Sequence, residues 1–178
     1  MRKKRPVLPL VLAVILAVGM FQPMPAAAAN LYFTGINDSV APLTSSSMPY
    51  WSGGTLYVPY TVFDANQNGV GVSLGLYTSY NHRSHIVTIF NLKQMLVFDL
   101  ERGTCRDDMT GAAYDARAVM RYGKPYVPLY VVCSVFGLEY SYNQLSYISQ
   151  GYLVRIKSAD AVLDDGLFID RARELINN

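Results

Sequence analysis

The clearest alternation of apolar and polar positions lies in residues 121–156. Residues 124–127 predict a short strand, and Pro128 follows where a proline can begin a helix, because the first turn leaves its N–H groups unpaired. Gly137 can adopt the left-handed conformation that ends a helix. Between them, helical spacing predicts one buried helix face made of Leu129, Val132, Cys133 and Phe136.

A β-hairpin is predicted directly after this helix. Apolar and polar residues alternate over 138–142 and again over 152–156, with Asn143 and Gln144 beginning a polar turn between the two runs. The block therefore predicts a strand, a helix and a hairpin in that order.

Residues 50–91 contain a weaker version of the same block. Tyr57-Val58-Pro59 recurs as Tyr126-Val127-Pro128, 69 residues later. A short helix is expected after Pro59, followed by strands over 70–74 and 85–90. These patterns predict an α+β fold in which two similar β-α-β-β half-modules, about 50–91 and 120–158, form a mainly antiparallel sheet core with short helices. A chance recurrence of the three residues is the alternative.

Other segments complete the predicted domain. Residues 30–48 are expected to form an N-terminal linker with an edge strand, and residues 94–100 and 113–120 two further strands on either side of a charged loop over 101–111. Residues 159–178 are expected to end in a helix that covers the module through Leu167, Phe168, Ala172, Leu175 and Ile176.

Three short runs together resemble a known family. Gly123-Lys-Pro-Tyr-Val-Pro-Leu, Phe136-Gly-Leu-Glu-Tyr and Leu153-Val-Arg-Ile are similar to the copper amine oxidase N-terminal-like domain, also called the stalk domain, of secreted Gram-positive proteins. The resemblance is assigned to residues 49–158. Tyr130 stands where the family commonly has arginine, and Tyr142 where it commonly has tryptophan.

The family name does not imply copper chemistry in this chain. In the family, that chemistry belongs to a separate catalytic domain with three histidines and a modified tyrosine, whereas this chain has 2 histidines. The resemblance instead implies an envelope module, or the N-terminal accessory domain of a wall-active enzyme such as a polysaccharide deacetylase whose catalytic domain is absent here.

Residues 1–29 predict a cleaved secretory signal, with an uncleaved anchor as the alternative. A basic start over 2–5 precedes an apolar run over 7–21, and four alanines over 26–29 offer a cleavage site. Removing the four basic residues of this start from the total of 15 leaves 11, against 13 acidic residues. We therefore expect a secreted or envelope protein, no nucleic-acid partner, and membrane contact only through the signal before cleavage.

No complete catalytic set is found. Gly71-Val-Ser73-Leu-Gly75 matches a nucleophile elbow, which needs an acid and then a histidine downstream. No carboxylate lies between Ser73 and His85 and no histidine lies after His85, so Ser73 is expected on the outside of a strand. His82 and His85 are expected in a turn, and a metal site there would need a third ligand, such as Asp64 or Asp99, which the sequence does not place beside them. Adjacent carboxylates at Asp107-Asp108 and Asp164-Asp165 indicate solvated surface. We expect no enzyme activity, no metal and no cofactor.

The two cysteines leave two structures open. Cys105 and Cys133 permit a disulfide in an exported protein, but Cys133 also suits the apolar helix face as a buried thiol.

The predicted function is a non-catalytic envelope module that binds or spaces. Flat aromatic rings on a sheet can stack on sugars or contact an envelope protein, and the candidate recognition surface is Tyr140, Tyr142, Tyr147 and Tyr152. Completion of the core is the alternative role for Tyr140 and Tyr142. The residues expected to define the fold are Pro59, Pro128, Phe136 and Gly137.

Overall fold

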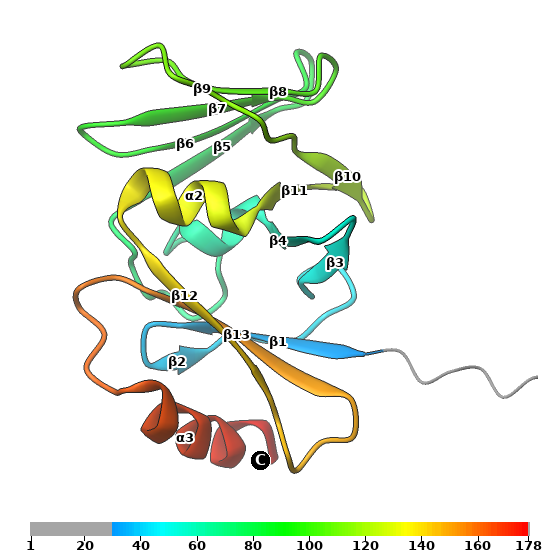
Figure 1. The fold of residues 1–178 in the computed structure, drawn as a ribbon, viewed down its shortest axis with the longest axis vertical. Helices are drawn as coiled ribbons and strands as arrows, with labels where there is room; N and C mark the ends of the chain where they lie inside the picture. The colour runs from blue at the N-terminus through cyan, green and yellow to red at the C-terminus, as the bar shows by residue number, and fades with distance from the viewer. Residues whose placement is uncertain (1–29, 178) are drawn as a thin grey trace, which may run out of the picture.

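The computed structural model describes residues 30–177, so the signal predicted over residues 1–29 lies outside the described part. The described chain forms three sheets, one 3-10 helix and two α-helices, one of them C-terminal (Figure 1). The sheets are mostly antiparallel, which confirms the predicted α+β class with a sheet core.

The middle sheet brings the two Tyr-Val-Pro segments together. Its strand order is β10-β11-β4-β3, with β3 at Tyr50–Ser52, β4 at Thr55–Pro59, β10 at Val119–Arg121 and β11 at Lys124–Pro128. Strands β4 and β11 pair antiparallel, with Val58 opposite Val127 and each proline opposite the tyrosine of the other strand. Both prolines end their strands, where the missing N–H interrupts least of the ladder.

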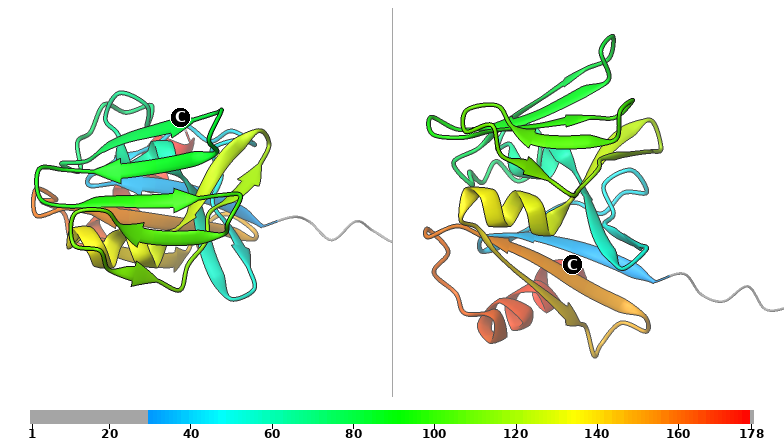
Figure 2. Two further views of the ribbon diagram at one scale, coloured as in Figure 1. Left: turned by 90° about the horizontal axis from the view of Figure 1, so that it is seen from above. Right: turned by 45° about the horizontal axis from the view of Figure 1, so that its top comes forward.

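Each proline is followed at once by a helix. The 3-10 helix η1 spans Tyr60–Phe63, and α2 spans Leu129–Phe136 and ends at Gly137, whose φ of 65° is the predicted left-handed cap. Helix α2 lies between the five-stranded sheet of β5 to β9, the upper sheet, and the sheet that contains β12 and β13, the lower sheet (Figure 1 and Figure 2). It therefore buries more than one face, through Leu129, Val131, Val132, Cys133 and Val135. Phe136, predicted to be buried, is half-buried at the edge of the core.

The upper sheet is a five-stranded antiparallel meander. Its strands follow chain order as β5 (Tyr77–Asn81), β6 (Ile86–Phe90), β7 (Met95–Asp99), β8 (Thr104–Asp107) and β9 (Ala113–Tyr114). The predicted charged loop over 101–111 is therefore wrong in part, because β8 lies within it. Cys105 and Asp107 of β8 are buried while Thr104 and Arg106 are exposed, but the sequence does not show this alternation, because Asp107 is a carboxylate. The strand predicted over 113–120 is split in two: β9 ends at Tyr114, where the Ala116 N–H donates to the Tyr114 carbonyl at 2.9 Å, and β10 begins at Val119.

The strand predicted over 70–74 is absent. The amide of Asn68 donates to the Val72 carbonyl at 2.7 Å, and its oxygen accepts from the N–H groups of Val70 and Gly71. These side-chain bonds hold an irregular segment, and Gly71 has a φ of 69°. The first strand of the hairpin is β5 instead.

The lower sheet joins the two ends of the described chain. Its order is β12 (Glu139–Gln144), β13 (Gly151–Lys157), β1 (Leu31–Ile36) and β2 (Ser39–Val40). The predicted hairpin of β12 and β13 is confirmed. Strand β1 was predicted at an edge but lies between β13, which it pairs in parallel over all six residues, and β2.

Helix α3 (Asp165–Asn177) covers one face of the lower sheet, as predicted, while the other face meets the main core. Phe168 and Ala172 are buried against the sheet, and Ile176 packs beside them. Leu167 and Leu175, predicted on the same face, are exposed. The buried stripe follows a spacing of four residues, which leaves these two leucines on its flanks.

Beneath α3, the lower sheet holds a buried arginine. Arg155 is 1% exposed, and its Nε donates to the Asn37 carbonyl at 2.9 Å. Its Nη1 donates to Asp165 Oδ1 and its Nη2 to Asp38 Oδ1, each at 2.8 Å, while Nη2 also donates to the Leu163 carbonyl at 2.8 Å. A buried charge needs pairing and hydrogen bonds of this kind. Arg155 thus connects β13, the β1–β2 turn and the start of α3.

An aromatic ring and a glycine complete this arginine site. The guanidinium carbon of Arg155 lies 4.1 Å from the ring centroid of Phe168. A Cβ atom on Gly35 would lie 2.6 Å from the same ring, so only glycine lets α3 approach this closely. The sequence did not predict this site. Arg155 alternates with Val154 and Ile156 on β13, so its side chain points away from the main core. It is buried only because α3 covers that face of the sheet.

Two carboxylates, those of half-buried Asp38 and buried Asp64, depend on hydrogen-bond donors. Burial by itself raises the pKa of Asp38, but the N–H groups of Val162 and Leu163 and the guanidinium of Arg155 outweigh it and lower the pKa. Burial likewise raises the pKa of Asp64, and its backbone and amide donors lower it below the ordinary value.

These lowered pKa values predict acid sensitivity. The carboxylates contribute stability that is complete above the unfolded-state pKa near 3.8 and is lost as pH falls through their lower folded-state values. Urea unfolding followed by fluorescence should therefore show a falling midpoint below about pH 4. Asp38→Asn removes one titrating group and should flatten that fall. An unchanged midpoint from pH 5 to pH 2.5 would contradict the assignment.

Candidate binding site

Four aromatic side chains form a continuous row where the lower sheet meets β3, and we call them the aromatic row. The rings of Tyr142 and Tyr152 stack with centroids 5.2 Å apart and an interplanar angle of 11°. The ring of Tyr32 stacks on Tyr152 with centroids 5.4 Å apart and also lies 6.3 Å from Tyr142, so the three tyrosine rings form a compact group. Trp51 meets Tyr142 edge to face at 5.6 Å. Both arrangements are favourable ring geometries.

Strand register builds this row. Tyr32 lies directly opposite Tyr152 in the parallel pair of β1 and β13. Tyr142 lies opposite Val154 in the antiparallel pair, so Tyr152 is its diagonal neighbour on the same face. Trp51 comes from the middle sheet, opposite Leu56 in the β3–β4 hairpin. The row therefore needs three separate parts of the chain.

The outer members of the row are accessible while its inner members are packed. Trp51 is 45% exposed and Tyr142 38% exposed, whereas Tyr32 is buried and Tyr152 half-buried. Burial, together with the neighbouring phenols of Tyr32 and Tyr152, raises the pKa of Tyr142 to about 12. Its phenol therefore stays neutral, which leaves an uncharged aromatic face with polar tips.

The four tyrosines of the predicted recognition surface are not all together. Tyr142 and Tyr152 meet in the aromatic row, and Tyr140 is 44% exposed on the same face of β12 as Tyr142. Tyr147 packs instead with the α3 cluster, with the guanidinium carbon of Arg173 4.9 Å from its ring centroid. It lies in the β12–β13 turn, which folds toward α3, so strand alternation did not predict its direction.

Sequence reasoning missed two members of the row. Trp51, the single tryptophan of the chain, and Tyr32 reach the row only through pairing with distant segments. Local periodicity holds no signal for such pairing. The exposure expected of a lone tryptophan on a short hairpin strand was the one available hint.

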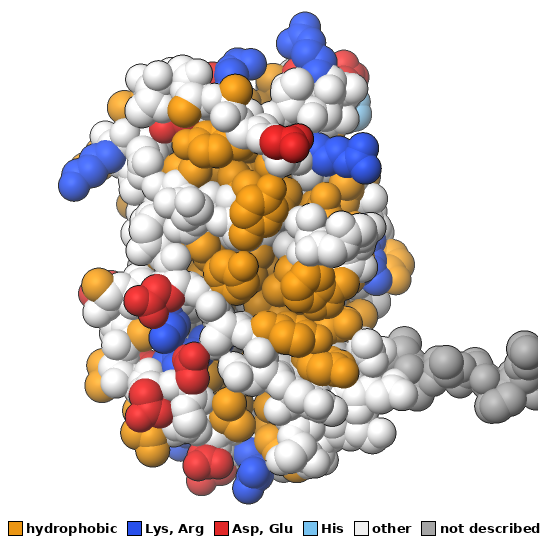
Figure 3. All heavy atoms as spheres, viewed as in Figure 1, with side chains coloured by type: hydrophobic (Ala, Val, Ile, Leu, Met, Phe, Trp, Pro, Cys, Tyr) orange, Lys and Arg blue, Asp and Glu red, His pale blue; other side chains and the backbone are white. Residues whose placement is uncertain are grey.

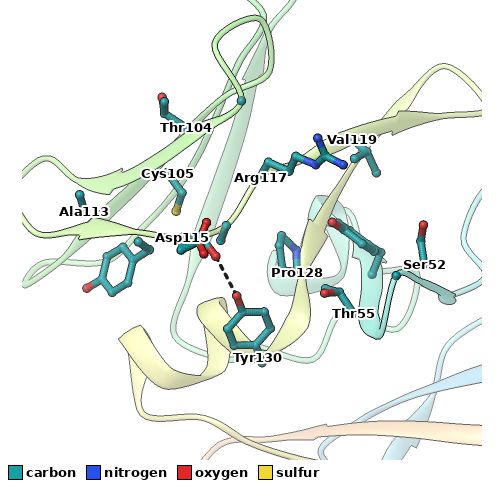
Figure 4. Close-up of a pocket in the computed structure, with 15 residues that line it drawn as sticks. Ser52, Thr55, Thr104, Cys105, Ala113, Asp115, Arg117, Val119, Pro128 and Tyr130 are labelled. Carbon is teal, nitrogen blue, oxygen red and sulfur yellow. Dashed lines mark hydrogen bonds between the residues drawn. The ribbon is translucent and has the colours of Figure 1, made fainter.

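A pocket of about 680 Å³ lies between the upper sheet, the middle sheet and the start of α2 (Figure 4). Its aromatic walls include Tyr57 and Tyr130. The Tyr130 hydroxyl donates to the Asp115 carbonyl at 3.1 Å, drawn as the dashed line in Figure 4, which fixes the direction of the ring. Its polar lining includes the side chains of Ser52, Thr55, Thr104, Asp115 and Arg117.

The aromatic row and the pocket share the β3–β4 hairpin. Trp51 of this hairpin contacts Tyr142 in the row, while Ser52, Thr55 and Tyr57 line the pocket. Figure 3 shows hydrophobic side chains gathered along the middle of one face, with most of the charged side chains near its margins. By strand alternation Trp51 points to one face of the hairpin and the three pocket residues point to the other, so the hairpin separates the row from the pocket.

The residues considered for catalysis are not brought together. Ser73 lies in the irregular segment rather than on a strand, and its hydroxyl accepts from the Gly75 N–H at 3.0 Å. His85 Nδ1 lies 3.3 Å from the Tyr80 hydroxyl, and the ring of His82 packs against Tyr80. Within residues 30–177, no three His, Cys, Asp or Glu side chains are grouped so as to hold a metal ion.

Both cysteines are buried free thiols. Burial raises the pKa of Cys105 and that of Cys133 to about 12, so neither is a reactive thiolate at neutral pH. Cys105 was predicted in a charged loop, but it lies on β8 and faces the core.

Comparison with known proteins gives no relative for this chain. No family model matches it, and no curated protein and no solved structure matches it either. None of the helices within residues 30–177 has both the length and the apolar composition needed to cross a membrane. Its fold and surface chemistry are therefore what point to a function.

Proposed function

We propose that this chain is an exported, non-catalytic module of the bacterial cell envelope that binds wall polysaccharide through the aromatic row. The observation that carries the proposal is the exposed edge of Trp51 and Tyr142, held in place by stacked rings behind it. Aromatic rings fixed in this way offer flat apolar faces to sugar rings, and little side-chain entropy is lost when they bind.

The stalk-type architecture is part of the same proposal. Support comes from the antiparallel pairing of the two Tyr-Val-Pro segments, in which Val58 meets Val127 at the centre. Each segment is preceded by a hairpin strand, β3 or β10, and followed by a helix and then a hairpin. We infer two half-modules that share one core, with β1, β2 and α3 added to the second and β7 to β9 to the first.

Binding to purified peptidoglycan tests the proposed function. Trp51→Ala and Tyr142→Ala should each weaken binding about 10- to 30-fold, as loss of a central aromatic contact does, at about 1.4–2 kcal/mol. Binding is measured by co-sedimentation with purified sacculi and by the fluorescence of Trp51 in the parent chain.

A matched control variant distinguishes binding at the aromatic row from non-specific binding. Tyr77 is an exposed tyrosine on β5, away from the row, so Tyr77→Ala should bind as the parent does. Thermal unfolding of each variant checks that the fold is retained. Unchanged binding by folded Trp51→Ala and Tyr142→Ala variants, or no binding by the parent chain, would refute the proposal.

A further inference from the structure

The pocket, which lies on the other face of the β3–β4 hairpin from Trp51, combines a fixed aromatic wall with polar groups that are free to bind. Tyr130 is 43% exposed although its hydroxyl is held by the Asp115 carbonyl, so its ring face is both fixed and accessible. Tyr57 is buried and stacks on Tyr50 at 5.4 Å, which makes it a rigid part of the wall. These rings have the apolar character of a sugar-stacking site.

The two charged side chains that line the pocket are not paired with other side chains of the described residues. Arg117 is exposed and forms no hydrogen bond or ion pair within residues 30–177, and the same holds for the carboxylate of Asp115. In contrast, Arg102 pairs with Asp99 at 3.2 Å, and Arg106 pairs with Asp108. A guanidinium without a partner in a pocket is suited to bind a carboxylate through two parallel hydrogen bonds.

The remaining polar lining suits hydroxyl groups. The side chains of Ser52, Thr55 and Thr104 can each donate and accept a hydrogen bond, and the Asp115 carboxylate can accept from a hydroxyl. One arginine and one aspartate leave the pocket with little net charge. This balance suits a sugar with one carboxylate and several hydroxyls better than a densely charged phosphate polymer.

We propose that this pocket binds a carboxylate-bearing sugar unit of the polysaccharide that the aromatic row holds. Arg117 binds the carboxylate, Tyr130 stacks on the sugar ring, and the hydroxyl side chains and Asp115 bond to ring hydroxyls. The volume of about 680 Å³ lies in the range of small-molecule sites. The inference rests on the proposed function, because it takes its class of sugar from the polysaccharide assigned to the row, and the β3–β4 hairpin carries the row on one face and the pocket on the other.

Two soluble tetrasaccharides of equal length test this inference by calorimetry. One alternates N-acetylglucosamine with N-acetylmuramic acid, which adds a lactyl carboxylate, and the other is neutral chitotetraose. The parent chain should bind the carboxylated probe about tenfold more tightly, as expected for one charge-assisted contact. Arg117→Gln should reduce this ratio to about one. Trp51→Ala should weaken binding of both probes and leave the ratio unchanged.

Lys93→Gln is the control, because it removes the same charge from the turn between β6 and β7, outside the pocket lining. It should keep the tenfold ratio. Equal affinity of the parent chain for both probes would overturn the inference and leave the proposed function standing. An equal fall of the ratio in Arg117→Gln and Lys93→Gln would also overturn it, since general charge would then explain the preference. Binding of neither probe would refute both proposals.

Discussion

Replacing Arg155 by alanine should lower the free energy of unfolding by about 3–5 kcal/mol. The change removes a buried guanidinium and leaves the carboxylates of Asp38 and Asp165 and two backbone carbonyls without that donor. It also opens space beside Phe168. Urea unfolding at pH 7 measures the loss, and α3 should become more accessible to proteolysis, because Arg155 connects it to the sheet.

Arg171→Ala is the matched control for this prediction. Arg171 lies on α3, the helix that Arg155 contacts from β13, but its ion pair with Glu174 at 3.2 Å is exposed. Such surface pairs contribute about 0–1 kcal/mol, so the variant should unfold almost as the parent does. A loss below about 1 kcal/mol for Arg155→Ala would show that the arginine site does not hold α3 in place.

Replacing Phe63 by alanine should cost about 3–5 kcal/mol, the usual loss for a fully buried phenylalanine. Phe63 ends η1 and has no exposed surface, so its removal leaves a cavity in the main core. Phe136→Ala should cost less, about 1–2 kcal/mol, because that ring is half-buried. Chemical unfolding of the two variants side by side measures the difference.

The sequence pattern alone predicted that Phe136 contributes more to stability than Phe63, so the two variants distinguish the sequence pattern from the structure. Helical spacing placed Phe136 on the buried face, whereas Phe63 follows Pro59 in a segment with a short and weak pattern. An equal loss for the two variants, or a larger one for Phe136→Ala, would contradict the core described here.

The aromatic row and the pocket, like the core, are formed by strands that are far apart in the sequence. Tyr142 and Tyr152 belong to one hairpin, so their proximity could be predicted from alternation and a short turn. Trp51 and Tyr32 join them from other strands, and the pocket draws its walls from the upper and middle sheets. Local pattern therefore predicted half of the aromatic row and nothing of the pocket.

The sequence by itself determined the α+β class, the strand, helix and hairpin from β11 to β13, the Gly137 cap and the C-terminal helix. These features follow from period, capping and turn chemistry within a few residues, which local interactions decide. The tertiary structure decided the central place of β1, the burial of Arg155 and the aromatic row. Arg155 bonds to Asn37 across 118 residues of chain, and only packing of distant segments selects such a partner.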